Sequence, residues 1–447
     1  MNRNSSIYFF AANLLKNHGK KMARVTFLAA LLAGVLFTPK YPLFRAGIRV
    51  PWSLGYASNI ARKIVYREPT SMPDWQFDDP GLLLFAVPFY LAQPSYLFSN
   101  PNKEIPRSFI WVMCAIYAVM MALLYWLCAQ FLGELVTLLL CSFLALSPVY
   151  RAAAMSVDVH LFPVYAGILF LLCAFLLGRR PTTRKSTLAL CAAGIFACDL
   201  FRSSGIFVTA GFLLLQARPE SLQALFPIRS GALVKNGALL CLGLLLAASL
   251  CSRGIGRAGH PVWHALHAGL MEFGGHIDER QQIYPFFVPK EEIPATAAWN
   301  PTWNDTFEIN FAKQKAPSAA AYSPEYSAVL REDFFRIVFS YPTGFAKLIS
   351  YRLWNFFDLN YWGRKEGTDY HSLPESFLSL RGFSSLLVFL LAGYGAVLAP
   401  IVAVTLLPLA LPPLLVSTTY FYYLLPGQFA LLLLAACAVA RIRRRFI

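Results

Sequence analysis

Apolar runs of about 17–25 residues recur along the chain, and this length spans the hydrocarbon core of a bilayer. Aromatic residues such as Trp126 and Tyr423 stand near the ends of runs, as they do in the aromatic belts of membrane proteins. Candidate spans occupy residues 25–38, 80–98, 108–128, 132–148, 160–178, 186–201, 204–217, 235–251, 383–399, 401–417 and 419–440. The pattern predicts an all-α integral membrane protein.

Composition supports lipid as the solvent for much of the chain. Hydrophobic residues make up 57% of it and charged residues only 14%, against about 25% charged in soluble domains. The formal net charge is +16, but the basic residues cluster beside apolar runs. We therefore attribute the charge to membrane topology and expect no nucleic-acid partner. The nine cysteines form no Cys-x-x-Cys pair, so neither structural zinc nor a disulfide framework is indicated.

Basic clusters orient a membrane protein, because Lys and Arg near the ends of spans stay in the cytoplasm. If every candidate run crossed the membrane, the basic clusters at 179–185 and 441–445 would lie on opposite sides. Removing the run at 80–98 resolves this conflict, and Pro88 and Pro94 are expected to break its helical hydrogen bonding. We therefore predict about ten transmembrane helices, with 80–98 at the membrane surface.

The predicted topology divides the chain into four parts. They are a cytoplasmic N-terminus (1–24), an N-terminal transmembrane module (25–251), an extracytoplasmic loop domain (252–382), and C-terminal transmembrane helices with a basic cytoplasmic tail (383–447). A first outside loop, 39–107, lies within the second part. We expect the protein in the cell inner (plasma) membrane, with both termini in the cytoplasm.

The loop 252–382 is predicted to mix helix and coil. Apolar residues between Tyr326 and Ser340 recur with a helical period, and Tyr341-Pro342 ends this helix. The aromatic-rich segment Lys347–Tyr361 fits a helix on the membrane surface, and it fits a helix of a soluble subdomain about as well.

Charged residues at membrane depth mark candidate sites, because burying one in lipid costs about 2.5–3.5 kcal/mol on insertion scales. Asp78 and Asp79 end the first outside loop, directly before Pro80. Two close carboxylates suit a general base or a metal and phosphate site, and they also suit a turn that caps a helix. Asp74, earlier in the same loop, fits the turn better.

Two further groups fall in short outside turns. Arg151, Asp158 and His160 lie between the predicted third and fourth spans, where Asp158 either has a functional role or caps the next helix. Asp199 and Arg202 lie between the predicted fifth and sixth spans. Arg202 either binds phosphate oxygens through its planar guanidinium or forms an ion pair with Asp199.

Three histidines, His260, His264 and His267, share one face if their segment is helical, because they are four and three residues apart. Such a face binds a metal or an anionic head group, or it belongs to an interfacial amphipathic helix. No glutamate follows the first histidine as in His-Glu-x-x-His metalloproteases, so a protease is not expected. Three acidic residues follow closely and are candidates to complete a site: Glu272, Asp278 and Glu279.

The layout resembles the GT-C superfamily of membrane glycosyltransferases, which includes protein O-mannosyltransferases and aminoarabinose transferases. Three stretches within roughly residues 25–217 carry this resemblance. The first is Asp78-Asp79-Pro80 with the apolar run after it. The second is Ile105-Pro-Arg-Ser together with Ala145-Leu-Ser-Pro, and the third is Arg151 through Asp158 before a basic inside loop. No Walker A, Gly-x-Gly-x-x-Gly or Gly-x-Ser-x-Gly motif is present, so nucleotide-driven chemistry is not indicated.

The resemblance implies transfer of a sugar from a polyprenyl-phosphate donor to a lipid or glycan acceptor outside the cytoplasm. It implies that Asp79 or Asp78 is the catalytic base, and that Asp158 positions the acceptor or binds a divalent cation, Mg or Mn. Substrate binding is assigned to five basic residues: Arg151, His160, Arg202, His260 and His264.

Two other functions fit a chain of this kind. One is a multi-pass transporter or flippase of lipid-linked or amphipathic solutes, and the other is a non-catalytic scaffold subunit. Transporters often contain inverted repeats and charges in the middle of their spans. This sequence shows no repeat, and its charges collect on one predicted face, which favours the enzyme.

Overall fold

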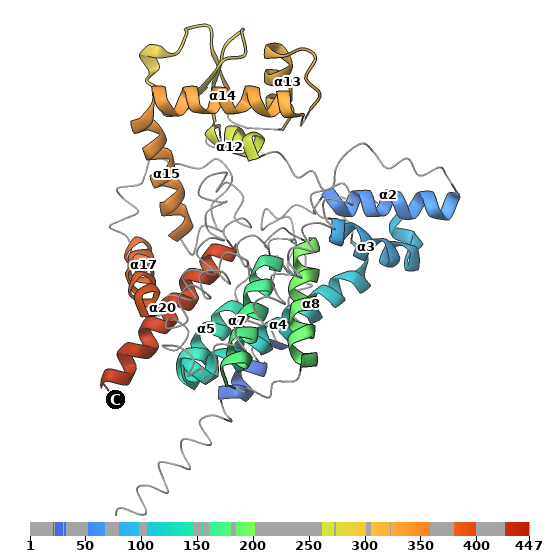
Figure 1. Ribbon diagram of the computed structural model, residues 1–447, viewed down its shortest axis with the longest axis vertical. Helices are drawn as coiled ribbons and strands as arrows, with labels where there is room; N and C mark the ends of the chain where they lie inside the picture. Colours follow the sequence, from blue (N-terminus) through green and yellow to red (C-terminus); the bar gives the residue numbers. More distant parts are fainter. Residues whose placement is uncertain are drawn as a thin grey trace, which may run out of the picture.

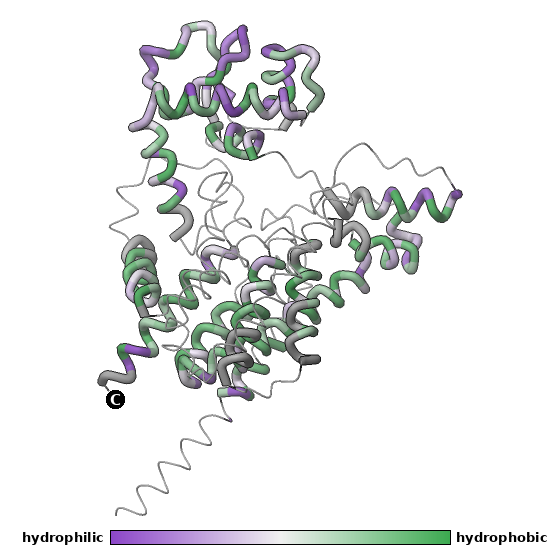
Figure 2. The backbone as a smooth tube through the Cα atoms, viewed as in Figure 1, coloured by the Kyte–Doolittle hydropathy of each residue, from purple (hydrophilic) through white to green (hydrophobic). Residues whose placement is uncertain are grey.

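The computed structural model describes a helical body and a smaller mixed domain (Figure 1). The described residues are 52–67, 80–97, 105–146, 161–179, 185–201, 262–271, 274–300, 305–321, 323–357, 380–398 and 425–446, with scattered residues between 21 and 32 and at 150 and 154. The body is predominantly hydrophobic, whereas the domain mixes hydrophilic and hydrophobic residues (Figure 2).

The helical body is built from helices that coincide with predicted apolar segments. They are α4 (Arg107–Phe131), α5 (Glu134–Leu146), α7 (Leu161–Arg179), α8 (Lys185–Phe201), α17 (Leu380–Leu398) and α20 (Leu425–Phe446). Helix α20 packs against α5, α7 and α17, and α4 packs against α5 and α7. The helical prediction is confirmed for these segments, while the predicted spans 204–217, 235–251 and 401–417 lie outside the described residues.

Two of the described helices, Arg107–Phe131 and Pro426–Arg443, are long and apolar enough to cross a membrane. With 25 residues, α4 extends about 37 Å, which exceeds the roughly 30 Å of a hydrocarbon core. These helices support a membrane location for the chain. The total of about ten spans and the orientation of the termini stay predictions.

The turn between α4 and α5 shows why the apolar run divides where it does. Gly133 has a φ of 86°, a conformation that a residue without Cβ adopts readily. The N–H of Leu132 still donates to Cys128 O at 2.8 Å, and that of Thr137 donates to Gly133 O at 3.1 Å. The chain therefore leaves one helix and enters the next within two residues.

The first loop contains helices α2 (Trp52–Tyr66) and α3 (Pro80–Ala92), followed by a 3-10 turn, η3 (Pro94–Leu97). The expectation that Pro88 breaks the run at 80–98 is wrong, since Pro88 lies inside α3. A proline lacks one N–H donor, and α3 tolerates this loss. The helix ends just before Pro94, and its 13 residues extend only about 20 Å, less than a bilayer core.

The two ends of the body carry different features. At one end, Arg24 forms an ion pair with Glu134 at 3.1 Å, and Tyr125 donates a hydrogen bond to the same carboxylate at 2.9 Å. The C-terminus of the chain lies toward this end (Figure 1). Helices α2 and α3 and the mixed domain lie toward the opposite end (Figure 1).

The mixed domain contains α12 (Val262–Leu270), α13 (Asp305–Lys315), α14 (Pro324–Ser340) and α15 (Pro342–Phe357). Between α12 and α13 lie β1 (Gly275–Ile277), β2 (Ile283–Pro285), the 3-10 turn η4 (Lys290–Glu292) and β3 (Ala298–Asn300). The strands form an antiparallel sheet in the order β2-β1-β3. The predicted mixture of helix and coil is therefore incomplete. Strands of three residues are too short to show an alternating pattern.

Helix α14 organises this domain and confirms the helix predicted at Tyr326–Ser340. Ser323 caps it, because the Ser323 hydroxyl accepts the N–H of Tyr326 at 3.1 Å and Pro324 occupies the first helical position. The domain core is apolar and draws on α12, β2, α14 and α15. Its buried residues are Leu270, Met271, Ile283, Phe334, Ile337 and Leu348.

Candidate functional site

Most of the predicted site residues lie outside the described part of the chain. They are Asp78, Asp79, Arg151, Asp158, His160, Arg202 and His260. Three of them are nevertheless bonded directly to described helix ends. Asp79 precedes Pro80, the first residue of α3; His160 precedes Leu161, the first residue of α7; and Arg202 follows Phe201, the last residue of α8.

Aromatic rings bring these three helices together. We define the aromatic cluster as Phe85, Phe89, Phe109, Phe162 and Phe201. The Phe85 ring centroid lies 5.7 Å from that of Phe201, and the Phe162 and Phe201 rings stack at 4.0 Å. Phe109 lies 5.8 Å from Phe85 and 4.9 Å from Phe89. The start of α7, the end of α8 and the first half of α3 therefore converge with the start of α4.

Because these helices converge, the helices that follow or precede the predicted site residues in the chain lie close together. Phe162 is the second residue of α7 and Phe201 is the last of α8, so the stacked pair lies next to the attachment points of His160 and Arg202. Adjacent Cα atoms are about 3.8 Å apart. Asp79 attaches to α3, whose Phe85 contacts Phe201. An aspartate, a histidine and an arginine therefore directly adjoin, in the sequence, helices that meet at one cluster.

Several buried polar atoms on the same helices have no hydrogen-bond partner among the described residues. They are Tyr90 Oη and Gln93 Oε1 from α3 and its end, Ser108 Oγ from α4, and Tyr165 Oη from α7. A buried polar group without a partner costs about 1–3 kcal/mol, so such groups usually have an explanation.

The two described histidines of the predicted histidine face are buried rather than presented to a ligand. On α12, Nδ1 of His264 lies 2.5 Å from Tyr326 Oη, and only 2% of His264 is exposed. The contact with Tyr326 gives His264 a structural role in the domain, and substrate binding by His264 stays a prediction. His267 is also buried, and the described residues contain no group of three side chains that could hold a metal ion.

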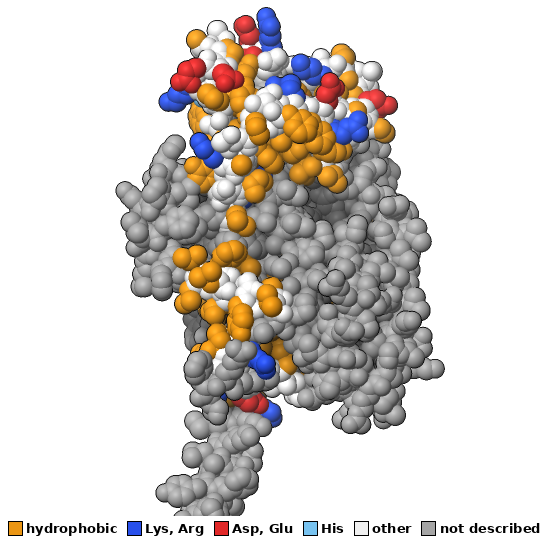
Figure 3. Space-filling model, turned by 60° about the vertical axis from the view of Figure 1, so that its left-hand side comes forward, with side chains coloured by type: hydrophobic (Ala, Val, Ile, Leu, Met, Phe, Trp, Pro, Cys, Tyr) orange, Lys and Arg blue, Asp and Glu red, His pale blue; other side chains and the backbone are white. Residues whose placement is uncertain are grey.

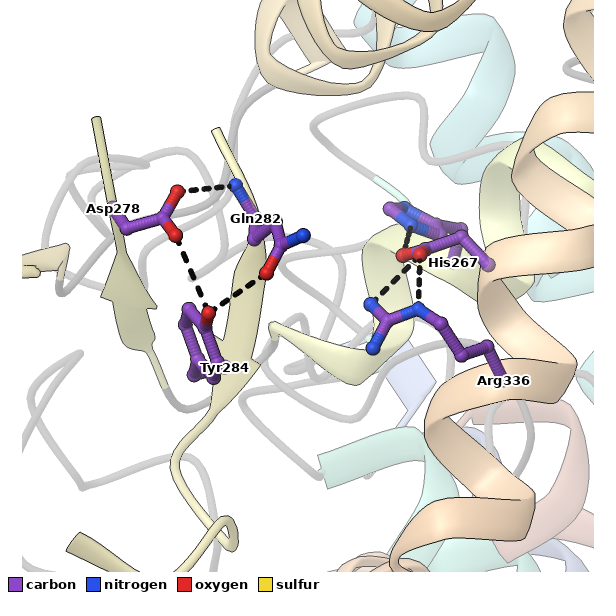
Figure 4. Close-up of polar contacts among 6 residues, drawn as sticks. His267, Asp278, Gln282, Tyr284 and Arg336 are labelled. Atoms are coloured by element: carbon purple, nitrogen blue, oxygen red, sulfur yellow. Dashed lines mark hydrogen bonds and ion pairs between the residues drawn. The ribbon is translucent and has the colours of Figure 1, made fainter. Parts of the chain in front are cut away.

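His267 belongs to a buried polar network, shown with Arg336 in Figure 4. Its Nε2 lies 3.1 Å from Asp333 Oδ2, and its Nδ1 lies 3.7 Å from Glu308 Oε1. Arg336 contacts the other Asp333 oxygen, with Nε at 2.8 Å and Nη2 at 2.7 Å. The network joins α12, α13 and α14 across the interior of the domain.

Asp278, which was a candidate to complete a histidine site, instead holds the β1–β2 turn (Figure 4). Its Oδ1 accepts the N–H groups of Arg280 and Gln282 at 2.9 and 2.8 Å, and its Oδ2 accepts the Tyr284 hydroxyl at 3.2 Å. Gln281 in this turn has a φ of 58°. Glu279 is exposed, and Glu272 lies outside the described residues.

The surface of the domain carries an apolar strip on α12 and α14, in which Val262, Phe335 and Phe339 are exposed and Trp263 is partly buried. Trp263 lies 5.4 Å from Phe335, and Phe335 stacks on Phe339 at 5.6 Å between ring centroids. Phe339 is 75% exposed. Hydrophobic side chains gather on the lower part of the domain in Figure 3, with charged side chains above them. An apolar strip bordered by charge is typical of a contact surface.

Sequence reasoning missed Glu308, Asp333 and Arg336. The spacing of Asp333 and Arg336, three residues apart, allows an ion pair along one helix, but nothing in the sequence links either of them to α12. A shallow pocket of about 330 Å³ was also missed; its lining is Gln281, Asn310, Lys313 and Gln314.

The chain matches no family model, no curated protein and no solved structure. The resemblance to the GT-C superfamily rests on the residues of this sequence alone and stays a prediction.

Proposed function

We propose that the protein is a membrane glycosyltransferase. In this proposal it transfers a sugar from a polyprenyl-phosphate donor to a lipid or glycan acceptor on the extracytoplasmic face of the inner (plasma) membrane. One observation carries the proposal: the aromatic cluster brings together the start of α7, the end of α8 and the first half of α3, the helices to which His160, Arg202 and Asp79 are bonded. Residues that are distant in sequence thereby attach to one end of the helical body.

The arrangement of the two ends supports the proposed sidedness. The mixed domain and α2–α3 lie toward the end opposite the Arg24–Glu134 ion pair and the C-terminus (Figure 1). Exposed Arg441 and Arg443 belong to the basic end of α20. Basic residues beside spans stay in the cytoplasm, so we place this end inside, with both termini cytoplasmic, and the cluster outside.

The proposed chemistry is an inverting displacement at the anomeric carbon of the sugar. An acceptor oxygen forms the new bond to that carbon while the bond to the phosphate oxygen breaks, and polyprenyl phosphate leaves. Asp79 or Asp78 takes the proton of the acceptor as general base. Arg202, Arg151 and His160 stabilise the charge on the departing phosphate. Asp158 positions the acceptor or contributes to binding a divalent cation, Mg or Mn.

The proposal is tested by sugar release from a labelled polyprenyl-phosphate sugar in proteoliposomes that contain the purified protein. We expect turnover by the wild type. Asp79→Asn or Asp78→Asn, whichever removes the base, should lose about 100-fold or more, because general acid–base groups contribute about 10²–10⁴-fold. Asp158→Asn should also lower turnover, because it removes the group that positions the acceptor or helps to bind the cation. Asp74→Asn is the matched control, since Asp74 belongs to the same loop and fits a turn; it should retain turnover.

The same proteoliposomes distinguish a glycosyltransferase from a transporter or flippase. If the labelled lipid crosses the bilayer intact while no sugar is released, the protein is a transporter or flippase and the enzyme proposal fails. Equal turnover in the wild type, Asp79→Asn and Asp158→Asn would show that these carboxylates are not the catalytic groups.

A further inference from the structure

The mixed domain has a charge network in a place where charges are rarely tolerated. His267 comes from α12, Glu308 from α13 and Asp333 from α14. The His267 and Glu308 side chains are 0% exposed, and the Asp333 side chain is 11% exposed. Charged side chains with so little access to water are almost always paired. The pairing here runs between three helices, so it bears on how they are held together.

The protonation state of His267 determines whether the carboxylates of Glu308 and Asp333 both have a hydrogen-bond donor and a positive charge beside them. Arg336 already contacts Asp333 Oδ1 through Nε and Nη2. Both Glu308 oxygens, in contrast, have no hydrogen-bond partner among the described residues, and their one close cation is His267, at 3.7 Å. A neutral imidazole has one N–H, whereas an imidazolium has two. Only the protonated ring faces both carboxylates with a donor and a positive charge.

We propose that this network is a proton-dependent latch, which holds α12 against α13 and α14 only while His267 is protonated. With His267 charged, the two carboxylates are balanced by His267 and Arg336. Loss of the proton leaves Glu308 buried beside a neutral ring. An uncompensated buried charge is strongly destabilising, so α12 is released or its surroundings open to water.

Among the described residues around this part of α12, no other cationic group can balance Glu308 when His267 loses its proton. On α12 itself, His264 contacts Tyr326 of α14. On α15, the buried Arg352 donates to the backbone oxygen of Gly269, and on the β1 side Asp278 is occupied by its own turn. The other charged side chains of α13 and α14 that the structure describes are exposed: Lys313, Lys315, Glu325, Arg331 and Glu332.

The direction of the pKa shifts agrees with this geometry. Burial by itself lowers the pKa of His267, but the hydrogen bond to Asp333 and the charges of Glu308 and Asp333 outweigh burial and raise it above its usual value. A group whose pKa is raised in the folded state contributes its full stability below its unfolded pKa, about 6.5 for histidine, and loses it as pH rises through the folded pKa. The latch therefore opens when the pH rises above the folded pKa of His267.

Hydrogen exchange followed by mass spectrometry on the full-length protein tests the latch from about pH 6 to about pH 9, the range in which a raised histidine titrates. After correction for intrinsic exchange, we expect protection of residues 262–271 to fall at least about tenfold with rising pH, while α4 stays unchanged. Glu308→Gln removes the buried charge and should abolish this pH dependence. Glu332→Gln, an exposed neutralisation on α14, should leave it intact.

The latch is refuted if the protection of α12 is independent of pH in the wild type, or if Glu308→Gln shows the same decline as the wild type. If Glu308→Gln does not fold, nitrogen chemical shifts of His267 in the wild type decide the question. Both ring nitrogens should carry protons at pH 6.5 and one of them should lose its proton at higher pH; a neutral ring at pH 6.5 overturns the proposal. The test is independent of sugar transfer, because it concerns only the interior of the domain.

Discussion

Helices α17 and α20 approach each other so closely at Gly395 that any side chain there would collide with the opposite backbone. A Cβ built on Gly395 would lie 1.9 Å from the carbonyl oxygen of Leu434 and 2.6 Å from its carbonyl carbon. Gly395 and Ala392 are buried on this face of α17. Small residues allow this kind of close contact between helices in membranes. We therefore predict that Gly395→Ala separates the pair.

The size of the effect follows from the overlap. Real Cβ atoms essentially never approach another atom closer than 3.0 Å, and ordinary contact begins at 3.4 Å, so the helices must move apart by about 1.1–1.5 Å. A gap of only 0.5–1 Å already forfeits about a quarter to a half of each contact's dispersion energy. Overpacking typically costs about 1–3 kcal/mol, and a backbone carbonyl cannot rotate away as a side chain can. We expect a cost at or above the upper end of this range.

Gly393→Ala is the matched control, because a Cβ on Gly393 meets nothing within 4 Å. Both substitutions gain the same helix propensity, about 1 kcal/mol at most, so the difference between the two variants isolates the collision. Unfolding of the purified variants in detergent, followed by tryptophan fluorescence, measures this difference. Stabilities that agree within about 0.5 kcal/mol would refute the close α17–α20 contact.

Two further substitutions test the mixed domain by the same unfolding measurement. Ser323→Ala removes the cap of α14 and should cost about 1 kcal/mol, whereas Ser323→Gly should cost only a few tenths; equal losses would contradict the cap. Asp278→Ala leaves the Arg280 and Gln282 N–H groups without their acceptor and should cost about 1–3 kcal/mol. Replacement of the exposed neighbour, Glu279→Ala, should be nearly neutral, and a comparable loss there would exclude the proposed turn.

Sequence pattern predicted the helices of the body because lipid-facing and core-facing positions are both apolar, which leaves long runs that are easy to recognise. The structure places α4 at Arg107–Phe131 where the pattern predicts 108–128, and α14 where Ser323 and Pro324 begin a helical period. Pro88 does not end α3, because one missing hydrogen bond does not end a helix whose other bonds and packing remain, and the helix stops only before Pro94.

The features that the sequence did not predict depend on contacts between helices that are far apart in the chain. The spacing of His264 and His267 predicts a shared face, but whether that face meets water or a core depends on Tyr326, Glu308 and Asp333, which lie 41–66 residues from the histidines they contact, on other helices. Convergence of Phe85, Phe162 and Phe201 likewise depends on how three helices pack. Local pattern carries no information on either arrangement.

The proposed function requires the loops 39–107 and 252–382 to lie on the same, extracytoplasmic side of the membrane. Labelling of single cysteines tests this directly. Asn59→Cys on α2, Ser318→Cys between α13 and α14, and Arg443→Cys on α20 replace exposed residues, and the native cysteines that the structure describes at 114, 128, 141, 198 and 437 are buried. Intact cells are treated with a maleimide that cannot cross membranes. We predict labelling of Asn59→Cys and Ser318→Cys in intact cells, and of Arg443→Cys only after permeabilisation. Labelling of Arg443→Cys in intact cells, or protection of either loop cysteine there, would contradict the account.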